Sequence, residues 1–219
     1  METINKLKLK EILGNILESM QDAKDELIAL DGAMGDGDLG LTMCKGFEAI
    51  YQEIDILEET DMGKLMMKLG MKMNSVVPST MGTLISTCFV KSAPKAKGKS
   101  ELNLTDLVEM GKAAVDGVMQ RGGSKIDDKT MLDALAPAIN ALEQSLSENK
   151  TLAEAQQAAY QASIEGVEKT KTLKSVHGRA AYYNEQSIGK QDPGATAVMY
   201  IFLSLIHISE PTRQAEISY

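Results

Sequence analysis

The sequence predicts an all-α fold, and three observations point to it. Apolar residues recur at the three- and four-residue spacing of amphipathic helices through most of the 219 residues. Alternating apolar and polar runs, which would indicate strands, are nearly missing. Aromatic residues make up only 4 % of the chain and Trp is absent, while there are 14 methionines. This composition predicts an aliphatic, Met-filled core, which suits packed helices better than a β-sandwich.

Apolar spacing and helix breakers predict the helices of the N-terminal half. The first helix has an apolar face made of Ile12, Leu13, Ile16, Leu17 and Met20. Helical patterns follow over residues 22–30, 42–54 and 62–73. Pro78 then interrupts the periodicity, so a buried helix is expected to begin near Ser79 or Thr80. Residues 91–103 contain two helix breakers and four lysines, and are predicted to form an exposed loop.

Capping signals organise the C-terminal half. Residues 104–119 have a helical pattern that the paired glycines of "QRGGSK" should end. Asp128 can cap a helix over residues 129–146. Thr151 and Glu154 form a capping box that opens the next helix, and "GATAVMYIFL" predicts the last one. No repeat or linker divides this pattern, so a single domain is predicted over residues 1–202.

Charge and cysteine usage exclude several classes of function. A net charge of −8 argues against a nucleic-acid-binding surface, and the local basic clusters are expected to be solvated loops. Cys44 and Cys88 form no CxxC and no metal-like spacing, which is typical of a reduced, cytoplasmic chain. The charged N-terminus does not resemble a secretory signal, and the longest apolar run is too short to span a bilayer. Neither a nucleic acid nor a membrane is therefore expected as a partner.

The stretch "DGAMGDGDLGLTM", residues 31–43, combines a GxGxxG pattern with three aspartates. A dinucleotide-binding turn needs a preceding strand, but the preceding residues have a helical pattern, and the carboxylates would repel a bare pyrophosphate. An EF-hand loop starting at Asp36 fails because its fifth and twelfth positions are Gly40 and Phe47. A Walker loop fails because no GK[ST] follows.

A magnesium site would reconcile the acids with phosphate binding. Mg²⁺ prefers oxygen ligands and often binds through carboxylates together with substrate phosphates. Asp31, Asp36 and Asp38 could hold one or two Mg²⁺ ions, while the following helix N-terminus would favour phosphate. The alternative is an acidic surface turn in which Asp38 serves as an N-cap, and composition alone leaves both interpretations open.

Three further stretches have glycine, hydroxyl or charged residues at predicted helix starts. They are "PSTMGTL", "RGGSKIDDKTMLDALAP" and "GRAAYYNEQSIGKQDPGATA". Each alone is more often a helix–helix connection than a site. His177 and His207, taken singly, are more often polar surface or core residues than ligands or bases.

The four stretches, in this order, resemble the L subunit family of dihydroxyacetone kinase. The resemblance implies a closed barrel of eight antiparallel helices with the nucleotide, ADP or ATP, at one end and two Mg²⁺ ions on its phosphates. It implies Asp31, Asp36 and Asp38 as the magnesium ligands. The nucleotide-binding residues that it implies are Leu39, Gly40, Leu41, Thr42, Thr80, Met81, Gly82, Gly122, Met131, Arg179, Asp192, Pro193 and Gly194.

The implied function is half of a kinase of glycerol metabolism. The chain would transfer phosphate by charge neutralisation and positioning, without a protein nucleophile, to a keto-sugar held by a separate K subunit. ADP would either stay bound and be rephosphorylated by a phosphotransferase-system M protein, or ATP would exchange as a substrate. A non-catalytic, nucleotide-sensing module that contacts a transcription regulator is the alternative from another class.

Two departures from the family pattern concern the substrate. Many L subunits carry His where this chain has Leu39, and a "GGTSG"-like turn where it has "PSTMG". These differences leave open a paralogue that acts on a tetrulose or a related triose.

Residues 203–219 are predicted to be a non-native tail. Their first part, "LSLIHISEPTR", can be encoded by a transposase-type sequencing adapter, and "ISY" suits the primer that follows it. The family's last helix would then be truncated near Phe202. An uninterrupted genomic reading frame that encodes this tail would contradict the prediction.

Overall fold

The computed structural model describes residues 3–206, whose regular secondary structure is almost wholly helical. The helices are α1 (Lys6–Asp22), α2 (Lys24–Gly32), α3 (Leu39–Ile56), α4 (Met62–Val76), α5 (Thr80–Ala96), α6 (Leu104–Gly122), α7 (Leu132–Ser147), α8 (Leu152–Thr170), the 3₁₀ helix η1 (Arg179–Ser187) and α9 (Pro193–Ile206). Two short strands, β1 (Ile4–Asn5) and β2 (Glu101–Leu102), pair antiparallel with Ile4 opposite Leu102. The predicted all-α class is confirmed.

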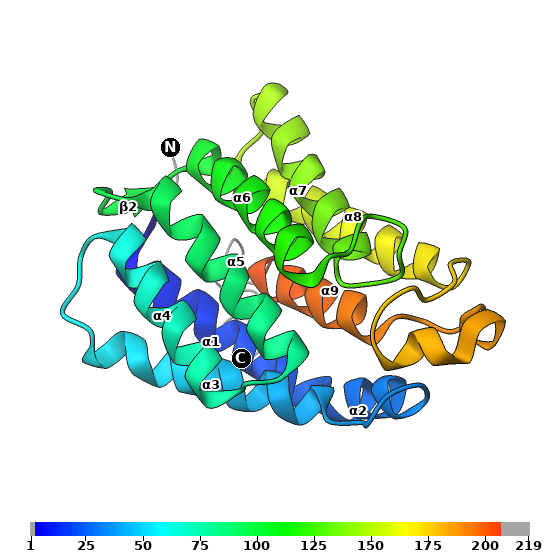
Figure 1. The fold of residues 1–219 in the computed structure, drawn as a ribbon. Helices are drawn as coiled ribbons and strands as arrows, with labels where there is room; N and C mark the ends of the chain where they lie inside the picture. The colour runs from blue at the N-terminus through cyan, green and yellow to red at the C-terminus, as the bar shows by residue number, and fades with distance from the viewer. Residues whose placement is uncertain (1–2, 207–219) are drawn as a thin grey trace, which may run out of the picture.

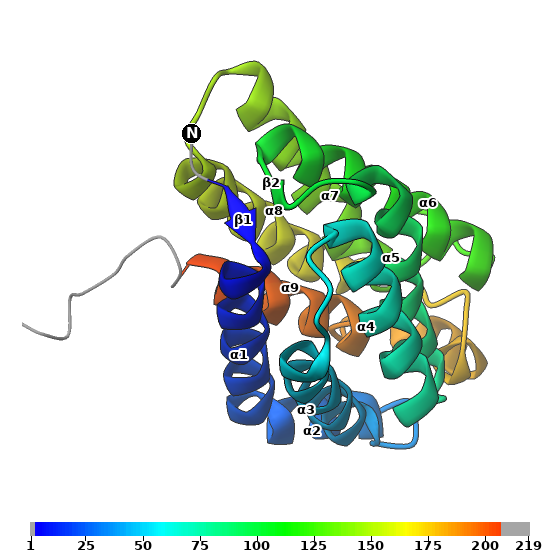
Figure 2. The same cartoon turned by 90° about the vertical axis from the view of Figure 1, so that its left-hand side faces the viewer.

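Contacts between neighbouring helices join α1 and the helices from α3 to α9, eight in all, into a closed ring. Figures 1 and 2 show this arrangement from two sides. The helices from α3 to α9 each pack against the next one in sequence, α9 packs against α1, and α1 packs against α3. α2 lies beside the ring, against α3 and α9. The predicted closed eight-helix barrel is therefore present.

The core of the barrel is aliphatic and rich in methionine, as the composition predicts. Met20, Met43, Met62 and Met73 are no more than 2 % exposed and pack with Phe47 in one continuous cluster. Unbranched Met side chains fill irregular gaps between helices, which compensates for the scarcity of aromatic residues.

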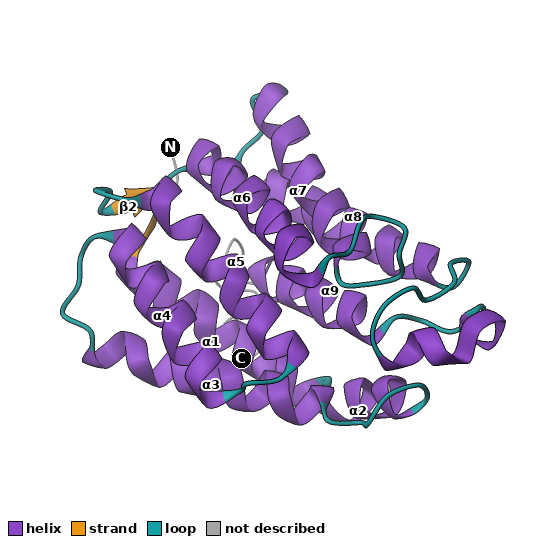
Figure 3. Ribbon diagram, in the orientation of Figure 1, coloured by secondary structure: helices purple, strands orange, loops and turns teal. Residues whose placement is uncertain are grey.

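The alternation of helix direction brings four connections to one end of the barrel. These are the turns before α3, between α4 and α5, between α6 and α7, and the long excursion between α8 and α9. In Figure 3 the loops that follow α2, α6 and α8 lie on the right of the view. The four sequence stretches that resemble the kinase family are the ones that form these connections.

The predicted exposed loop over residues 91–103 is confirmed for residues 97–100 and wrong for the residues on either side. α5 continues to Ala96 with Pro94 inside it, and residues 101–102 form β2. Pro94 removes one backbone donor from the last turn. Burial of Ala93 and Ala96 and a hydrogen bond from Ser92 Oγ to Met110 O (2.8 Å) hold that turn against α6.

The predicted N-cap at Asp128 is also wrong, because α7 begins four residues later at Leu132. Asp127 and Lys129 have positive φ angles of 73° and 61°, which turn the chain back before the helix. Asp133 accepts hydrogen bonds from the N–H groups of Asp127 (2.6 Å) and Thr130 (2.7 Å) instead. The capping box of Thr151 and Glu154 is confirmed, and α6 ends at the paired glycines as predicted.

Residues 207–219, which include His207 and most of the predicted non-native tail, lie outside the described residues. Residues 203–206 continue α9 without a break. The domain boundary at residue 202 stays a prediction. Among residues 3–206, no helix combines the length and the apolar character needed to cross a membrane.

Candidate functional site

Three aspartates converge at the turn between α2 and α3. Asp31, Asp36 and Asp38 each offer one carboxylate oxygen, and these oxygens lie within 4.8 Å of one another. Asp31 Oδ2 accepts hydrogen bonds from the N–H groups of Asp38 (3.0 Å) and Leu39 (3.3 Å), which fixes the turn. Asp38 precedes α3, but its side chain makes no capping hydrogen bond. Ordinary N-capping therefore does not account for this carboxylate.

The electrostatics of the cluster favour a cation. Burial raises the pKa of Asp38, and the neighbouring carboxylates of Asp36 and Asp31 raise it further, whereas Arg179 lowers it. Within residues 3–206 the cluster forms one ion pair, in which Arg179 Nη2 lies 2.8 Å from Asp36 Oδ2. A hard divalent cation would relieve the remaining repulsion, and three exposed or half-exposed carboxylates are a ligand set that Mg²⁺ accepts. The residues present fit a magnesium ion.

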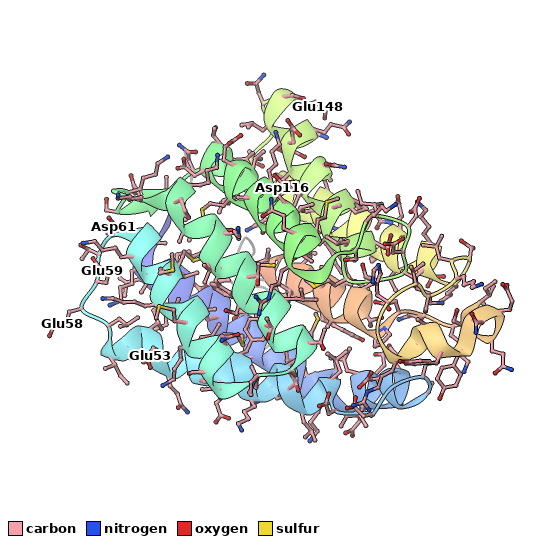
Figure 4. All side chains as sticks on the ribbon, viewed as in Figure 1. Glu53, Glu58, Glu59, Asp61, Asp116 and Glu148 are labelled. Atoms are coloured by element: carbon pink, nitrogen blue, oxygen red, sulfur yellow. The ribbon has the colours of Figure 1, made fainter. Side chains whose placement is uncertain are left out.

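Other acidic side chains of the chain are placed differently. In Figure 4 the labelled Glu53, Glu58, Glu59 and Asp61 lie on the left, at the opposite end of α3 from the aspartate cluster. Lysines of α4 form ion pairs with two of them, Lys72 with Glu53 (2.9 Å) and Lys68 with Glu59 (3.4 Å). Glu53 and Glu59 thus have lysine partners, whereas the aspartate cluster has none in the part of the chain that the structure describes.

The aspartate cluster opens onto a cavity of about 670 Å³ at the end of the barrel. The four connections at this end all contribute to its wall, which is large enough for a nucleotide-sized ligand. Of the predicted site residues, those that line it are Asp31, Asp36, Asp38, Leu39, Thr80, Met81, Gly122, Met131, Arg179, Asp192, Pro193 and Gly194. Leu39, where many family members have His, is an apolar, largely buried part of this wall.

Four predicted residues do not line the cavity. A Cβ on Gly40 would lie 2.3 Å from Lys24 O, and a Cβ on Gly82 would lie 2.1 Å from Val77 O. Both glycines therefore permit close backbone approach between elements. Leu41 and Thr42 line a second, smaller hollow of about 380 Å³ that shares Asp38, Pro78 and Ser79 with the cavity.

Several cavity residues were not predicted individually. They are Met34, Gly35, Pro78, Ser79, Leu84, Ser124, Lys129, Thr130, His177, Gly178 and Ala180. Most lie inside the stretches that the sequence singled out, so position within a motif was the available signal. His177, expected to be a polar surface or core residue, has its Nε2 2.9 Å from Asp128 Oδ2 and lines the cavity.

Comparison with known proteins adds an independent observation. The model of the DAK2 domain family matches residues 33–207. This chain belongs to the DAK2 domain family. The DAK2 domain thus includes every predicted site residue except Asp31, which lies two residues before the matched range.

Relatives of this DAK2 domain include kinase subunits of similar length. The "PEP-dependent dihydroxyacetone kinase, ADP-binding subunit DhaL" of Escherichia coli K12 is 35% identical over 179 residues, which are 82% of this chain and 85% of the relative. A subunit with the same description from Listeria innocua, numbered 1, is 34% identical over 194 residues, 89% of this chain and 92% of the relative.

Solved structures support the same fold. The native dihydroxyacetone kinase of Citrobacter freundii superposes with a TM-score of 0.72 at 26% identity, over 94% of this chain and 35% of that chain. Its complex with AMP-PNP and Mg²⁺ gives the same TM-score at 25% identity. This DAK2 domain therefore spans about a third of that longer kinase.

Asp192 is a buried carboxylate in the cavity wall of this DAK2 domain. Its Oδ2 accepts a hydrogen bond from Ala195 N (2.7 Å) at the start of α9. Burial raises the pKa of Asp192 to about 7; the N–H of Ala195 and the cation of Lys129 oppose this shift, and the Asp133 carboxylate adds to it. The folded protein thus holds a proton on Asp192 at pH values where the unfolded chain has released it.

Replacing Asp192 with Asn should make stability less sensitive to pH. Because the folded-state pKa lies above the ordinary value near 4, the wild type loses stability as pH rises from about 4 to about 7. Asn keeps the acceptor for Ala195 without the buried charge. We expect the variant to gain about 1 kcal/mol or more relative to wild type at pH 8 and little at pH 4.5, measured by urea unfolding. A gain confined to pH 4.5 would contradict the burial argument.

Proposed function

We propose that this chain is the ADP- or ATP-binding subunit of a dihydroxyacetone-type kinase, which passes phosphate from magnesium-bound nucleotide to a short ketose. The observation that carries the proposal is the aspartate cluster at the mouth of a nucleotide-sized cavity. Relatives described as ADP-binding subunits DhaL support it, as does the solved relative in complex with AMP-PNP and Mg²⁺.

Each wall of the cavity has a role in this proposal. Asp31, Asp36 and Asp38 would hold one or two Mg²⁺ ions, which neutralise phosphate charge when bound. The N-terminus of α5 at Thr80 and Met81 would offer N–H groups to phosphate oxygens. Gly122 and Met131 would flank the adenine, and the Asp192–Gly194 turn would close the site.

Arg179 would neutralise charge on the phosphates. It is 65% exposed in its side chain and reaches the cluster from the start of η1. A guanidinium in this place can move from Asp36 to a phosphate oxygen when magnesium takes over the carboxylate.

The acceptor would be held by a separate K subunit. Exposed apolar side chains occur on the excursion beside the cavity, where Tyr182 is 86% exposed, Val176 54% and Ile188 45%. Leu41, at 57%, adds to them from α3. Exposed apolar side chains at this end of the barrel would be available to a docking protein. Such docking in the cytoplasm would bring the ketose to the phosphate.

Two hypotheses about the phosphate donor remain open. Whether the purified chain retains nucleotide distinguishes them. If ADP is a coenzyme that a phosphotransferase-system M protein rephosphorylates, ADP should survive dialysis of the purified chain. If ATP is an exchanging substrate, the dialysed chain should be empty and should turn over with ATP and a K subunit. Relatives described as PEP-dependent or PTS-dependent favour the first version.

The second candidate function is a kinase whose substrate is a tetrulose or a related triose. The D-erythrulose kinase of Mycolicibacterium smegmatis is 28% identical over 83% of this chain and 32% of that relative. Phosphorylation of dihydroxyacetone and of erythrulose should be compared with purified K partners and both phosphate donors. If no K partner supports phosphorylation of either ketose, the kinase proposal is wrong and a nucleotide-sensing module that contacts a transcription regulator takes its place.

A further inference from the structure

Lys129 is a buried cation that no part of the proposed phosphate chemistry uses. Its residue is 2 % exposed and its backbone has a φ of 61°, in the left-handed region. Its Nζ donates to three backbone carbonyl oxygens, those of Leu173 (3.3 Å), Ser187 (2.5 Å) and Lys190 (2.6 Å). An ammonium group carries three donors, so this arrangement satisfies all of them.

These acceptors lie at both ends of the excursion between α8 and α9. Leu173 precedes η1, whereas Ser187 and Lys190 stand at and beyond its end. The adjoining turn adds further bonds, from Val176 N to Asp128 O (3.2 Å) and from His177 Nε2 to Asp128 Oδ2 (2.9 Å). One buried side chain thus links the two ends of the excursion to the turn before α7.

The excursion places Arg179 at the cavity. Arg179 begins η1, and its side chain is largely exposed apart from the ion pair with Asp36. η1 has few core contacts of its own, since Ser187 is the one buried residue among its nine. Its position therefore depends on the polar bonds at its two ends rather than on apolar packing.

We propose that Lys129 is a positioning residue that fastens the 173–190 excursion and so holds Arg179 over the aspartate cluster. Burial of an ammonium group is costly unless its donors are hydrogen-bonded, and the three carbonyl acceptors of Lys129 meet that condition. The burial lowers the pKa of Lys129 while Asp192 raises it, which is the electrostatic cost of this fastening. The link to nucleotide binding rests on the proposed function, whereas the fastening does not.

Hydrogen exchange in the ligand-free protein tests the fastening. In Lys129→Met we expect faster exchange in peptides covering 173–190 and unchanged exchange in the middle of α8. Lys129→Arg should recover part of the protection, because it keeps a charged donor. Lys174→Met is the matched control: its ion pair with Glu185 (3.0 Å) also links the two ends of the excursion, but an exposed pair contributes little, so the exchange should stay unchanged.

A double-mutant cycle with Arg179→Gln tests the link to the site. Lys129→Met should weaken Mg²⁺–ADP binding by about tenfold or more in the wild type, and by less than about twofold once Arg179 is replaced. If Lys129→Met loses its helical circular dichroism, Lys129→Arg takes its place in both measurements, with a smaller loss.

Two results would overturn the proposal. One is unchanged exchange over 173–190 in the Lys129 variants, and the other is a loss of affinity that is the same with and without Arg179. If the wild type binds no Mg²⁺–ADP, the proposed function fails, yet the exchange measurement still decides whether Lys129 fastens the excursion.

Discussion

Replacing Asp38 with Asn should abolish magnesium-dependent nucleotide binding and leave the metal-free fold as stable as before or slightly more stable. The two effects have opposite signs because the carboxylate that would bind Mg²⁺ is repelled by Asp36 and Asp31 when no cation is present. Asp38 makes no capping hydrogen bond, so its amide analogue removes no structural contact of α3. With a K partner, turnover should fall by on the order of 100-fold or more.

Thermal unfolding with and without Mg²⁺–ADP measures both effects at once. The wild type should be stabilised by the ligand, whereas Asp38→Asn should show no such shift. Asp116→Asn is the matched control, because Asp116, labelled in Figure 4, is an exposed carboxylate of α6 that does not line the cavity. A ligand-induced shift that survives in Asp38→Asn would argue against magnesium binding by this cluster.

Gly82→Ala should destabilise the fold by about 2–4 kcal/mol, although Ala is the better helix former. The new Cβ would lie 2.1 Å from the carbonyl oxygen of Val77 and 2.8 Å from a methyl group of its side chain. The backbone oxygen cannot move without shifting the turn that carries Pro78 and Ser79 into the cavity. The resemblance to the kinase family predicts Gly82 as a nucleotide contact, whereas its position predicts mainly a loss of stability.

Urea unfolding of the ligand-free protein separates these two roles. Gly32→Ala serves as the control, because a Cβ there meets its nearest neighbour at an ordinary 3.8 Å. We expect near-wild-type stability for Gly32→Ala and a clear loss for Gly82→Ala. If Gly82→Ala weakens only nucleotide binding, the packing explanation is wrong.

The helices could be predicted because their signals are local. Periodic apolar residues and the capping box at Thr151 are read from neighbouring residues in the chain. The loop predicted from Pro94 was wrong over the last turn of α5, because that turn is held by a contact with α6 that neighbouring residues in the sequence do not reveal. The N-cap predicted at Asp128 was wrong because the neighbouring residues have positive φ angles, so α7 starts later and Asp133 accepts the hydrogen bonds at its start.

The candidate site could be predicted in part because its acids share one short turn. Asp31, Asp36 and Asp38 are close in sequence, and the antiparallel helices carry the other motifs to the same end of the barrel. Lys129 gave no signal of its own, since its burial and its three carbonyl partners arise from a segment more than forty residues away. Gly40 and Gly82 lie in the predicted motifs, but tertiary contacts give them a packing role.

Crystals of the protein grown with ADP and Mn²⁺ would test the central claim most directly, because anomalous scattering locates Mn²⁺ in place of Mg²⁺. The account predicts at least one Mn²⁺ coordinated by oxygens of Asp31, Asp36 and Asp38 and by ADP phosphate oxygens, with the adenine in the 670 Å³ cavity. ADP bound elsewhere, or ADP in the cavity with no ion between its phosphates and these carboxylates, would contradict it.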